Sequence, residues 1–321
     1  MEHPAKDLAA RLVGQVSQVI VGKEDVIRRV VLALLCGGHL LLEDIPGTGK
    51  TTLAKALARS IDCPWNRVQF TPDLLPSELT GINYYNQKQG EFVFRPGALF
   101  TSILLADEIN RATPRTQSSL LECMEEGQVS VDGQTYPLSR PFLVIATQNP
   151  IEIQGTFPLP EAQLDRFFMR LSMGYPDPES EAQMLLNLAQ VHPVESVKPV
   201  ADAAAVLAAG EEIRAVRASL PVRQYIVALA AATRTSERTR LGVSPRGCIA
   251  LMRAAQGQAA MEGRDYLLPD DVKEVAPYVL AHRVIMKGFS AAQSGAEAEG
   301  FIRQLLKEVP VPVEPAGGFG G

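Results

Sequence analysis

Three short stretches of this sequence place polar residues directly after an apolar run. The first is PGTGKTT, in which two glycines are followed by a lysine and two threonines. Glycine lets backbone N–H groups turn toward phosphate oxygens without a Cβ in the way, and the helix that follows adds its positive end. Lys50 can reach the β- and γ-phosphates of a nucleotide, and the Thr51 hydroxyl can bind Mg²⁺. The residues that we expect to hold the nucleotide here are Pro46, Gly47, Thr48, Gly49, Lys50, Thr51 and Thr52.

One position of this loop departs from the usual pattern, which has a glycine where this chain has Asp44. A carboxylate aimed at phosphates would be repelled, so we expect the Asp44 side chain to point away from them. A chance glycine turn is the alternative interpretation. The apolar run HLLLED before the loop and the helical pattern TTLAKALARSI after it favour a phosphate site, because strand, glycine loop and helix are its usual context.

Two further stretches end in acids or an amide that suit the same chemistry. In ILLADEINR, an apolar strand delivers Asp107 and Glu108 to its carboxyl end, where the ligands of parallel sheets bind. Asp107 is suited to hold Mg²⁺ through a water, and Glu108 to orient and deprotonate an attacking water. In VIATQNP, Asn149 could hydrogen-bond that water or the γ-phosphate. Taken separately, the acids could be a plain turn after a buried strand, and Asn-Pro only a turn signal.

The elements that must position these residues follow from apolar periodicity. Short apolar runs separated by helical patterns predict an α/β class, with a parallel sheet covered by helices. After Tyr175 the sequence is alanine-rich and helical without strand patterns, so we expect a second, all-helical domain. The predicted strands lie at 39–44, 67–70, 102–107, 142–147 and 167–173. The predicted parts of the chain are a core at 1–178, a linker at 179–199, the helical domain at 200–310 and a flexible tail at 311–321.

Two segments that interrupt this alternation are typical of hairpins. The stretch GEFVFRPG alternates like a strand and can pair with INYY before it, which makes an insert at about 82–95. The stretch 128–138 has Asp132-Gly133 between two alternating segments, a strong signal for a two-residue turn. We therefore expect two antiparallel hairpins in addition to the parallel sheet.

The composition and net charge of the chain disfavour several classes of protein. Hydrophobic residues make up 46% of the 321 residues, enough for a substantial buried core. The net charge of −5 disfavours nucleic acid as the main partner, since such proteins are usually basic. The longest apolar run, Val30 to Leu42, is too short to span a bilayer, and the first residues lack a secretory pattern. We expect a cytoplasmic protein without membrane insertion. The scattered cysteines and histidines offer no metal-ligand cluster.

Four longer strings resemble the MoxR family of AAA+ ATPases. They are QFTPDLLPSELTG, LADEINRATPRTQSSLLECMEE, ATQNPIEIQGTFPLPEAQLDRF and SPR, and the similarity runs from about Val21 to about Val284. The third string is highly specific to that family, whereas the glycine loop alone is not. The resemblance implies an AAA+ αβα P-loop core with a five-stranded parallel sheet, followed by an all-helical lid domain. It equates the hairpin at 128–138 with the pre-sensor hairpin and the insert at 82–95 with the helix-2 insertion.

The resemblance also implies roles for residues outside the loop and the acid pair. Asn149 takes the sensor-1 role, and Arg166 matches the arginine finger, which reaches into the site of a neighbouring subunit. Arg246 matches sensor 2, a lid residue that faces the γ-phosphate. Such proteins typically assemble as homo-oligomeric rings, usually hexamers, with ATP and Mg²⁺ between neighbours. The segment that contacts adenine is matched by Ile20, Val21 and Gly22.

From the residues alone, both arginines allow other interpretations. Arg166 could be a surface side chain that pairs with Asp165 or Glu161. Arg246 could cap a loop or lie in solvent, within an arginine-rich stretch that could also be a nucleic-acid patch. In the roles implied by the resemblance, the two arginines would supply the charge compensation that phosphoryl transfer needs beyond Mg²⁺ and Lys50.

The implied function is ATP hydrolysis by a ring-forming chaperone that remodels or matures partner proteins or complexes. Members of the family often act on partners with von Willebrand factor A (VWA) domains and sometimes assist metal or cofactor insertion. Alternatives are a nucleic-acid motor, a metal-chelatase motor subunit, and a nucleotide-gated scaffold with little turnover. Glu108 argues against the scaffold, and the acidic net charge argues against the nucleic-acid motor.

Overall fold

A computed structural model of the chain describes residues 3–45, 47–149, 155–188, 193–289 and 295–312. The chain forms two compact units, one of Asp7–Gly210 and one of Met1–Lys6 together with Glu211–Gly321. The division falls inside helix α8 (Ala203–Ala215), so a single helix carries the chain from the first unit into the second. The boundaries predicted at residues 178, 199 and 310 remain predictions.

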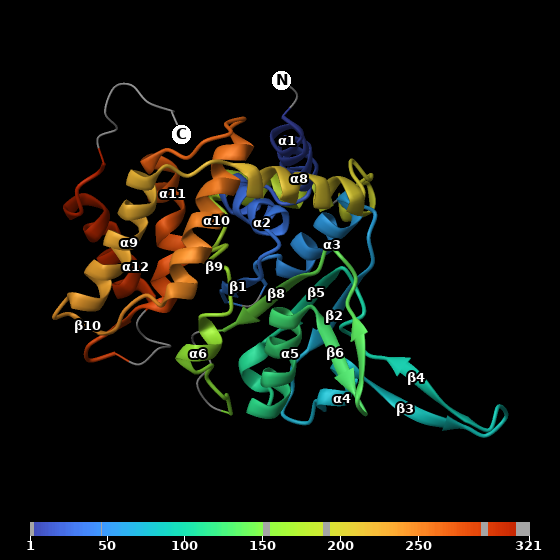
Figure 1. Ribbon diagram of the computed structural model, residues 1–321. Helices are drawn as coiled ribbons and strands as arrows, with labels where there is room; N and C mark the ends of the chain where they lie inside the picture. The colour runs from blue at the N-terminus through green and yellow to red at the C-terminus, as the bar shows by residue number, and fades with distance from the viewer. Residues whose placement is uncertain (1–2, 46, 150–154, 189–192, 290–294, 313–321) are drawn as a thin grey trace. The chain divides into compact units, whose positions relative to one another are not determined.

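The first unit is built on five strands: β1 (Leu40–Glu43), β2 (Trp65–Gln69), β5 (Ile103–Asp107), β8 (Leu143–Gln148) and β9 (Met169–Leu171). They form one parallel sheet in the order β2-β5-β8-β1-β9, shown in Figure 1. All five predicted strands are confirmed. Strands β5 and β8 are buried along their whole length, because helices cover both faces of an inner parallel strand, and this explains why the first four residues of each are apolar.

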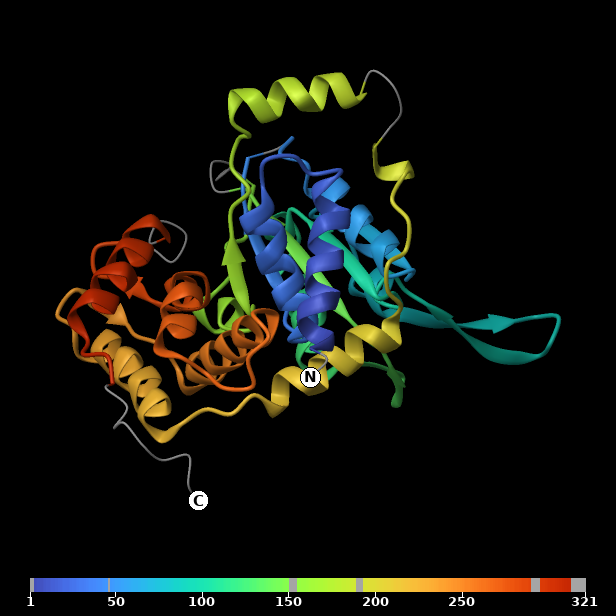
Figure 2. The same cartoon turned by 90° about the horizontal axis from the view of Figure 1, so that it is seen from above.

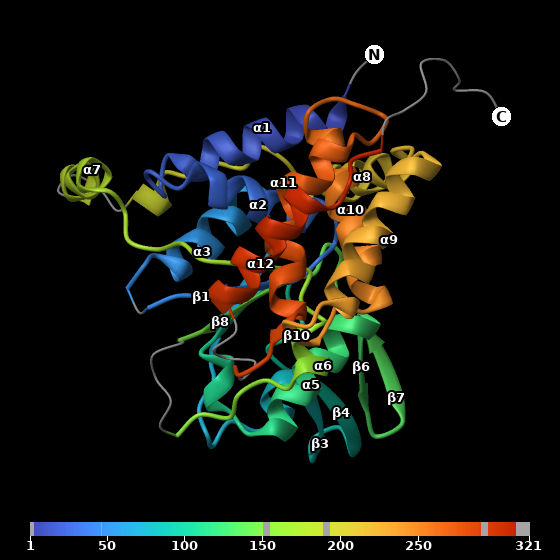
Figure 3. The same cartoon turned by 90° about the vertical axis from the view of Figure 1, so that its left-hand side faces the viewer.

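Helices cover the two faces of this sheet. The helices α2 (Glu24–Leu35) and α3 (Lys50–Ser60) lie on one side and α5 (Pro114–Glu126) on the other, as Figures 1 and 3 show. The second half of helix α2 is buried all round, since every residue from Val30 to Leu35 is buried, as in a helix that lies inside a core. The remaining elements of this part of the chain are α1 (Pro4–Ser17), α4 (Pro76–Thr80), η1 (Ile109–Arg111), α6 (Glu161–Leu164), α7 (Pro178–Leu188) and η2 (Pro193–Glu195).

Both predicted hairpins are present: β3 (Gly81–Asn86) pairs with β4 (Glu91–Pro96), and β6 (Gln128–Val131) pairs with β7 (Gln134–Pro137). Figures 1 and 2 show the β3–β4 hairpin extending away from the sheet. Side chains brace the two hairpins against each other. The rings of Phe94 and Tyr136 stack with centroids 3.9 Å apart, and Asn83 Nδ2 donates a hydrogen bond to Asp132 Oδ2 at 2.8 Å.

The second unit is helical, as predicted, with one short addition. Its helices, which Figure 3 labels, are α9 (Leu220–Thr235), α10 (Pro245–Met261), α11 (Pro269–Leu280) and α12 (Gly295–Glu308). A short 3₁₀ helix, η3 (Ala281–Arg283), follows α11. The addition is an antiparallel pair of strands, β10 (Thr239–Leu241) and β11 (Ile285–Met286), which are too short to leave a periodic pattern in the sequence. Within the described parts of the chain, no helix is long and apolar enough to cross a membrane.

Candidate active site

The glycine loop joins β1 to α3 at the carboxyl edge of the sheet. Gly47 and Gly49 have φ angles of +84° and +88°, a conformation that residues with a Cβ disfavour, and Gly49 caps the N-terminus of α3. Lys50 Nζ donates hydrogen bonds to the carbonyl oxygens of Asp44 at 3.2 Å and Ile45 at 2.9 Å. These acceptors are neutral, so a phosphate group, which is charged, would bind the ammonium more strongly.

Asp44 is buried, and its carboxylate accepts three hydrogen bonds from the segment that follows β9. The donors are Ser172 Oγ at 2.9 Å, the Met173 N–H at 2.6 Å and the Gly174 N–H at 3.0 Å. The side chain therefore points toward the end of β9, in agreement with the expectation from the sequence. In this position the aspartate fixes the segment that follows β9 against the end of β1.

The acid pair lies after β5 on the same edge of the sheet, and Thr147 of β8 joins its two members. Glu108 has a φ of +57°, in the left-handed region that is uncommon for a residue other than glycine. Its N–H donates to Thr147 Oγ1 at 2.8 Å, and the Thr147 hydroxyl donates to Asp107 Oδ1 at 2.7 Å. A side chain from the neighbouring strand thus holds the turn that presents both acids.

Donors from β2 and η1 contact the remaining side of the acid pair. Arg67 donates to Asp107 Oδ2 from Nε at 3.1 Å and from Nη2 at 2.6 Å. Gln69 Nε2 donates to Glu108 Oε2 at 2.6 Å, and Arg111 Nη1 lies 3.3 Å from the same oxygen. Neither Arg67 nor Gln69 was predicted as a site residue from the sequence. Their only signal was the alternation in RVQF, which places both side chains on one face of β2.

Asn149 directly follows β8, which lies between β1 and β5 in the sheet. It therefore shares the carboxyl edge with the loop and the acid pair. Thr51 and Thr52 lie in the first turn of α3, whereas Pro46 lies outside the described residues. The Thr51 hydroxyl and the Asp107 carboxylate are the oxygen ligands that Mg²⁺ prefers. Among the described residues, no group of three or more His, Cys, Asp or Glu side chains could hold a metal by itself.

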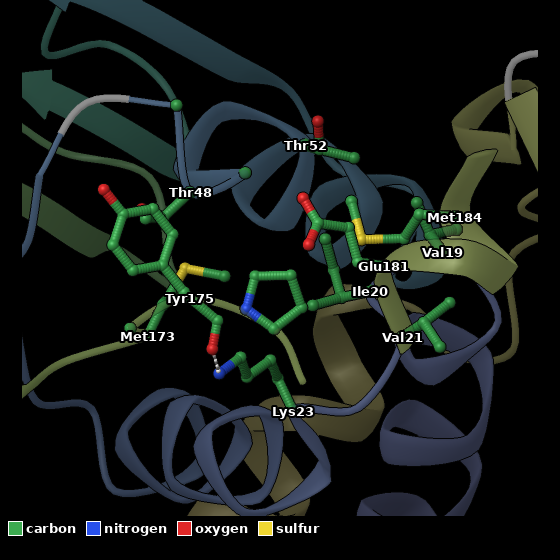
Figure 4. Close-up of a pocket in the computed structure, with 14 residues that line it drawn as sticks. Val19, Ile20, Val21, Lys23, Thr48, Thr52, Met173, Tyr175, Glu181 and Met184 are labelled. Atoms are coloured by element: carbon green, nitrogen blue, oxygen red, sulfur yellow. Dashed lines mark hydrogen bonds between the residues drawn. The ribbon is translucent and has the colours of Figure 1, made fainter. Parts of the chain in front are cut away.

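A mostly apolar pocket of about 430 Å³ lies beside the loop, as Figure 4 shows. Such walls suit the faces of a nucleotide base. Ile20 and Val21, which the resemblance assigns to adenine contact, both line it, as does Thr52 of α3. At its edge, Lys23 Nζ donates to the carbonyl oxygen of Tyr175 at 2.6 Å, which ties the start of the chain to the segment after β9.

Gly22, the third residue implied for adenine contact, serves this pocket indirectly. Its φ is +73°, and a Cβ at this position would lie 2.1 Å from Ser180 Oγ and 2.8 Å from Ser180 Cβ. Ser180 belongs to the first turn of α7, whose later residues Glu181 and Met184 line the pocket. The absence of a side chain at Gly22 therefore allows α7 to approach and close one wall. The assignment of this pocket to adenine remains a prediction.

The two arginines implied by the resemblance have different surroundings. Arg166 follows α6, and its Nε lies 3.2 Å from Glu125 Oε2 of α5, so this side chain pairs with a distant residue in the sequence. Arg246 is exposed in the first turn of α10 in the second unit. A cation in the first turn opposes the helix macrodipole, so helix stability does not explain this arginine. Contact of either side chain with a nucleotide remains a prediction.

His39 lies just before β1, at the amino end of the strand and therefore away from the edge that carries the acids. Its Nδ1 accepts from the Val144 N–H at 3.0 Å, and its Nε2 lies 3.0 Å from the carbonyl oxygen of Met124. Burial lowers the pKa of His39 from 6.5 to about 4, against the opposing effect of the Met124 hydrogen bond. The ring is therefore neutral at pH 7, with its proton on Nε2.

Comparisons with known proteins cover nearly the whole chain. A profile described as "ATPase family associated with various cellular activities (AAA)" matches residues 39–169, and one described as "AAA lid domain" matches residues 231–305. The chain is 48% identical to the uncharacterised protein YeaC of Bacillus subtilis, across 97% of this chain and 96% of the relative. It is 38% identical to the chaperone MoxR1 of Mycobacterium tuberculosis, across 94% of this chain and 82% of the relative.

A solved structure agrees with these relatives. The protein from Cytophaga hutchinsonii, which is provisionally named an ATPase, superposes with a TM-score of 0.87 at 40% identity, and the match covers 96% of each chain. The similarity to this neighbour therefore includes the sequence as well as the fold. It extends along both the core and the helical unit.

Proposed function

Because the chain belongs to the MoxR family of AAA+ ATPases, we propose that it binds ATP with Mg²⁺ and hydrolyses the bond to the γ-phosphate. The observation that carries this proposal is the meeting of three strand ends at one edge of the sheet. The glycine loop follows β1, the acid pair follows β5, and Asn149 follows the strand β8 between them. Ligands of open parallel sheets bind at this edge.

The loop binds and orients the phosphates. The turn of the loop depends on Gly47 and Gly49. Its backbone N–H groups would face an anion bound at the N-terminus of α3. Lys50 exchanges its carbonyl partners for phosphate oxygens. Thr51 and Asp107 would hold Mg²⁺, the latter through a water, and the ion would neutralise charge that develops on the phosphates.

The reaction itself needs a base and a donor. Glu108 takes the proton of the attacking water, since its carboxylate stands at the strand end with Oε2 already held by Gln69. Asn149 orients that water or the γ-phosphate from the neighbouring strand. Both roles are part of the proposal. They are supported by the position of Glu108 and Asn149 at the same edge of the sheet.

We extend the proposal to a ring in which Arg166 of one subunit completes the site of the next. The pairing of Arg166 with Glu125 is compatible with this role. It leaves the guanidinium partly exposed and compensates its charge until a stronger anion takes the place of the carboxylate. The sensor-2 role of Arg246, which is exposed in the first turn of α10, is part of this proposal and comes from the resemblance to the family.

Steady-state hydrolysis tests the first part of the proposal. Glu108→Gln is expected to bind ATP as the wild type does and to lower turnover by roughly 10²-fold or more, because a positioned base is lost. Glu126→Gln, which changes an exposed glutamate at the end of α5, is the matched control and should retain wild-type turnover. A wild-type protein no faster than Glu108→Gln would contradict the proposal.

A mixing experiment tests the ring. Arg166→Ala is expected to lose roughly 10³-fold in turnover, in line with other arginine fingers. If the finger acts between subunits, equal amounts of Glu108→Gln and Arg166→Ala should recover activity. In a randomly mixed ring, about a quarter of the interfaces would join an intact Glu108 to an intact Arg166. No recovery on mixing would exclude a finger supplied by a neighbour.

We further propose that hydrolysis drives the remodelling of a partner protein. The relative named MoxR1 is a chaperone by name, and the β3–β4 hairpin carries exposed apolar rings, Tyr85 at 54% and Phe92 at 74%. Rings exposed on a braced hairpin are suited to contact a polypeptide. A VWA-domain protein, with or without a metal or cofactor to be inserted, is the partner class that the resemblance favours.

Affinity capture tests the partner. Glu108→Gln with ATP should retain both the ring and its client, whereas Lys50→Ala, which cannot hold the phosphates, should retain neither. Recovery of free monomer alone under both conditions would contradict the ring and the client. If DNA stimulates the ATPase and co-purified protein does not, the alternative of a nucleic-acid motor is favoured instead.

A further inference from the structure

Thr147 makes a hydrogen bond to each member of the acid pair, Asp107 and Glu108. It lies on the fully buried strand β8, and its own exposure is 1%. Its Oγ1 accepts from the Glu108 N–H at 2.8 Å and donates to Asp107 Oδ1 at 2.7 Å. The hydroxyl has a single proton, so these two bonds fix its direction: the proton points at Asp107 and a lone pair at Glu108.

The bond from the Glu108 N–H to Thr147 stabilises an unfavourable backbone conformation at Glu108. Glu108 is held at φ +57°, where a residue with a side chain costs roughly 1 kcal/mol or more and persists only when its surroundings enforce it. The Glu108 N–H is the group that Thr147 anchors. Without that acceptor the turn could relax toward a right-handed conformation, and the Glu108 carboxylate would leave its place at the strand end.

The second bond sets the orientation of the other acid. Asp107 Oδ1 accepts from Thr147, while Oδ2 accepts twice from Arg67 of β2. A carboxylate held through both oxygens, from the strands on each side of it, cannot rotate freely. The lone pairs that remain on it are therefore presented in one direction, which is what a water on Mg²⁺ requires.

We infer that Thr147 is the positioning residue of the hydrolytic site: one hydroxyl from β8 sets the direction of both Asp107 and Glu108. The inference rests on the proposed ATPase activity and adds to it a residue that touches no substrate. We expect binding of the nucleotide to depend mainly on the loop and the apolar pocket beside it, and much less on this hydroxyl. Loss of the hydroxyl should therefore slow hydrolysis and leave affinity intact.

The alternative is that Thr147 is an ordinary buried hydroxyl that only stabilises the fold. The chain contains a matched example in Thr233 of α9, which is also buried. Its Oγ1 donates to the Ala230 carbonyl at 2.6 Å and accepts from the Val243 N–H at 2.9 Å. The bonding pattern is the same, one donated bond and one accepted from a backbone N–H, but no acid is involved. Thr233→Val thus measures what the loss of such a hydroxyl costs by itself.

The experiment compares Thr147→Val, Thr147→Ser and Thr233→Val. Valine keeps the shape of threonine and removes the hydroxyl, whereas serine keeps the hydroxyl. We expect Thr147→Val to lower kcat by about tenfold to a hundredfold, with the Kd for ATP changed by less than about threefold. Thr147→Ser should recover most of kcat, and Thr233→Val should leave kcat unchanged at a temperature where all variants are folded.

Thr147→Val with wild-type kcat would overturn the inference and leave the proposed ATPase standing. Equal losses of kcat and ATP affinity in Thr147→Val would also overturn it, since they indicate general damage to the site. If the wild type itself does not exceed Glu108→Gln, the proposed function fails and the inference with it. Should Thr147→Val not fold, Thr147→Ala takes its place under the same criteria, because its smaller side chain cannot clash in the buried site.

Discussion

Arg67 of β2 donates two hydrogen bonds to one oxygen of Asp107, Oδ2, at 3.1 and 2.6 Å. Asp107 is also the carboxylate that we expect to hold Mg²⁺ through a water. A guanidinium and a divalent cation are both attracted to this negative charge and repel each other, so each weakens the binding of the other. Arg67 therefore acts as a counter-ion for Asp107 when the metal is absent.

Replacing Arg67 with glutamine should lower the Mg²⁺ concentration that gives half-maximal ATPase activity. The Arg67 side chain is 47% exposed, so its effect is screened by solvent, and we expect a shift of about threefold. Arg67→Lys keeps the positive charge and serves as the control, with a Mg²⁺ requirement close to that of the wild type. An unchanged or increased requirement in Arg67→Gln would contradict the idea of a competing counter-ion.

Asp44→Gly restores the common form of the loop but should destabilise the protein. The substitution leaves the Ser172 hydroxyl and the N–H groups of Met173 and Gly174 without their acceptor. Met173 is the buried one of these donors, and a buried N–H without a partner costs about 1–3 kcal/mol, so we expect a clear fall in the melting temperature. Calorimetric titration with ADP should show no gain in affinity. An increase by orders of magnitude would mean that Asp44 does face the phosphates.

His39 makes the fold sensitive to acid. Its pKa is about 4 in the folded chain and near 6.5 when exposed, so below pH 6.5 the unfolded state binds the extra proton. The contribution to stability is complete above pH 6.5 and falls as the pH drops toward 4, by roughly 3 kcal/mol in all. Denaturant unfolding at pH 7.5 and pH 5 measures it. His39→Gln, which does not titrate, should show a smaller difference between the two pH values than the wild type.

Gly22→Ala should weaken nucleotide binding through α7. The added Cβ would overlap Ser180 and displace the helix that carries Glu181 and Met184 to the pocket, and we expect the Kd for ATP to rise by about tenfold. Gly37→Ala is the matched control, because Gly37 also has a positive φ, +64°, but a Cβ there meets nothing within 4 Å. Similar Kd values for the two variants would contradict a role for the contact between the added Cβ and Ser180.

Much of the fold was predictable because it depends on local patterns. The five parallel strands are apolar runs between helices, and the two hairpins follow from alternation and, at Asp132-Gly133, from a turn signal. The loop and the acid pair were identifiable for the same reason, since each directly follows its strand. The short pair β10 and β11 left no such pattern, because two or three residues are too few for an alternation to be distinguished from chance.

The contacts around the acids were not predictable, because they depend on the order of strands in the sheet. Arg67 and Gln69 meet the acid pair only because β2 lies beside β5, although a helix and a hairpin separate the two strands in the sequence. Thr147 has the β-branched side chain of an ordinary strand residue. Arg166 had acids next to it in the sequence, yet its partner, Glu125, comes from α5. Local patterns contain no information about such distant neighbours.

The stack of Phe94 on Tyr136 also has a mechanical consequence. The stack lies nearer the base of the β3–β4 hairpin than Tyr85 and Phe92 do, so the exposed part of the hairpin can pivot about the stack. A small rotation of the β6–β7 hairpin, which directly follows α5, would become a larger displacement at Phe92, and a force on Phe92 would be transmitted back to α5. The acids after β5 precede α5 in the chain, so the same movement would link the hairpin to the proposed site of hydrolysis.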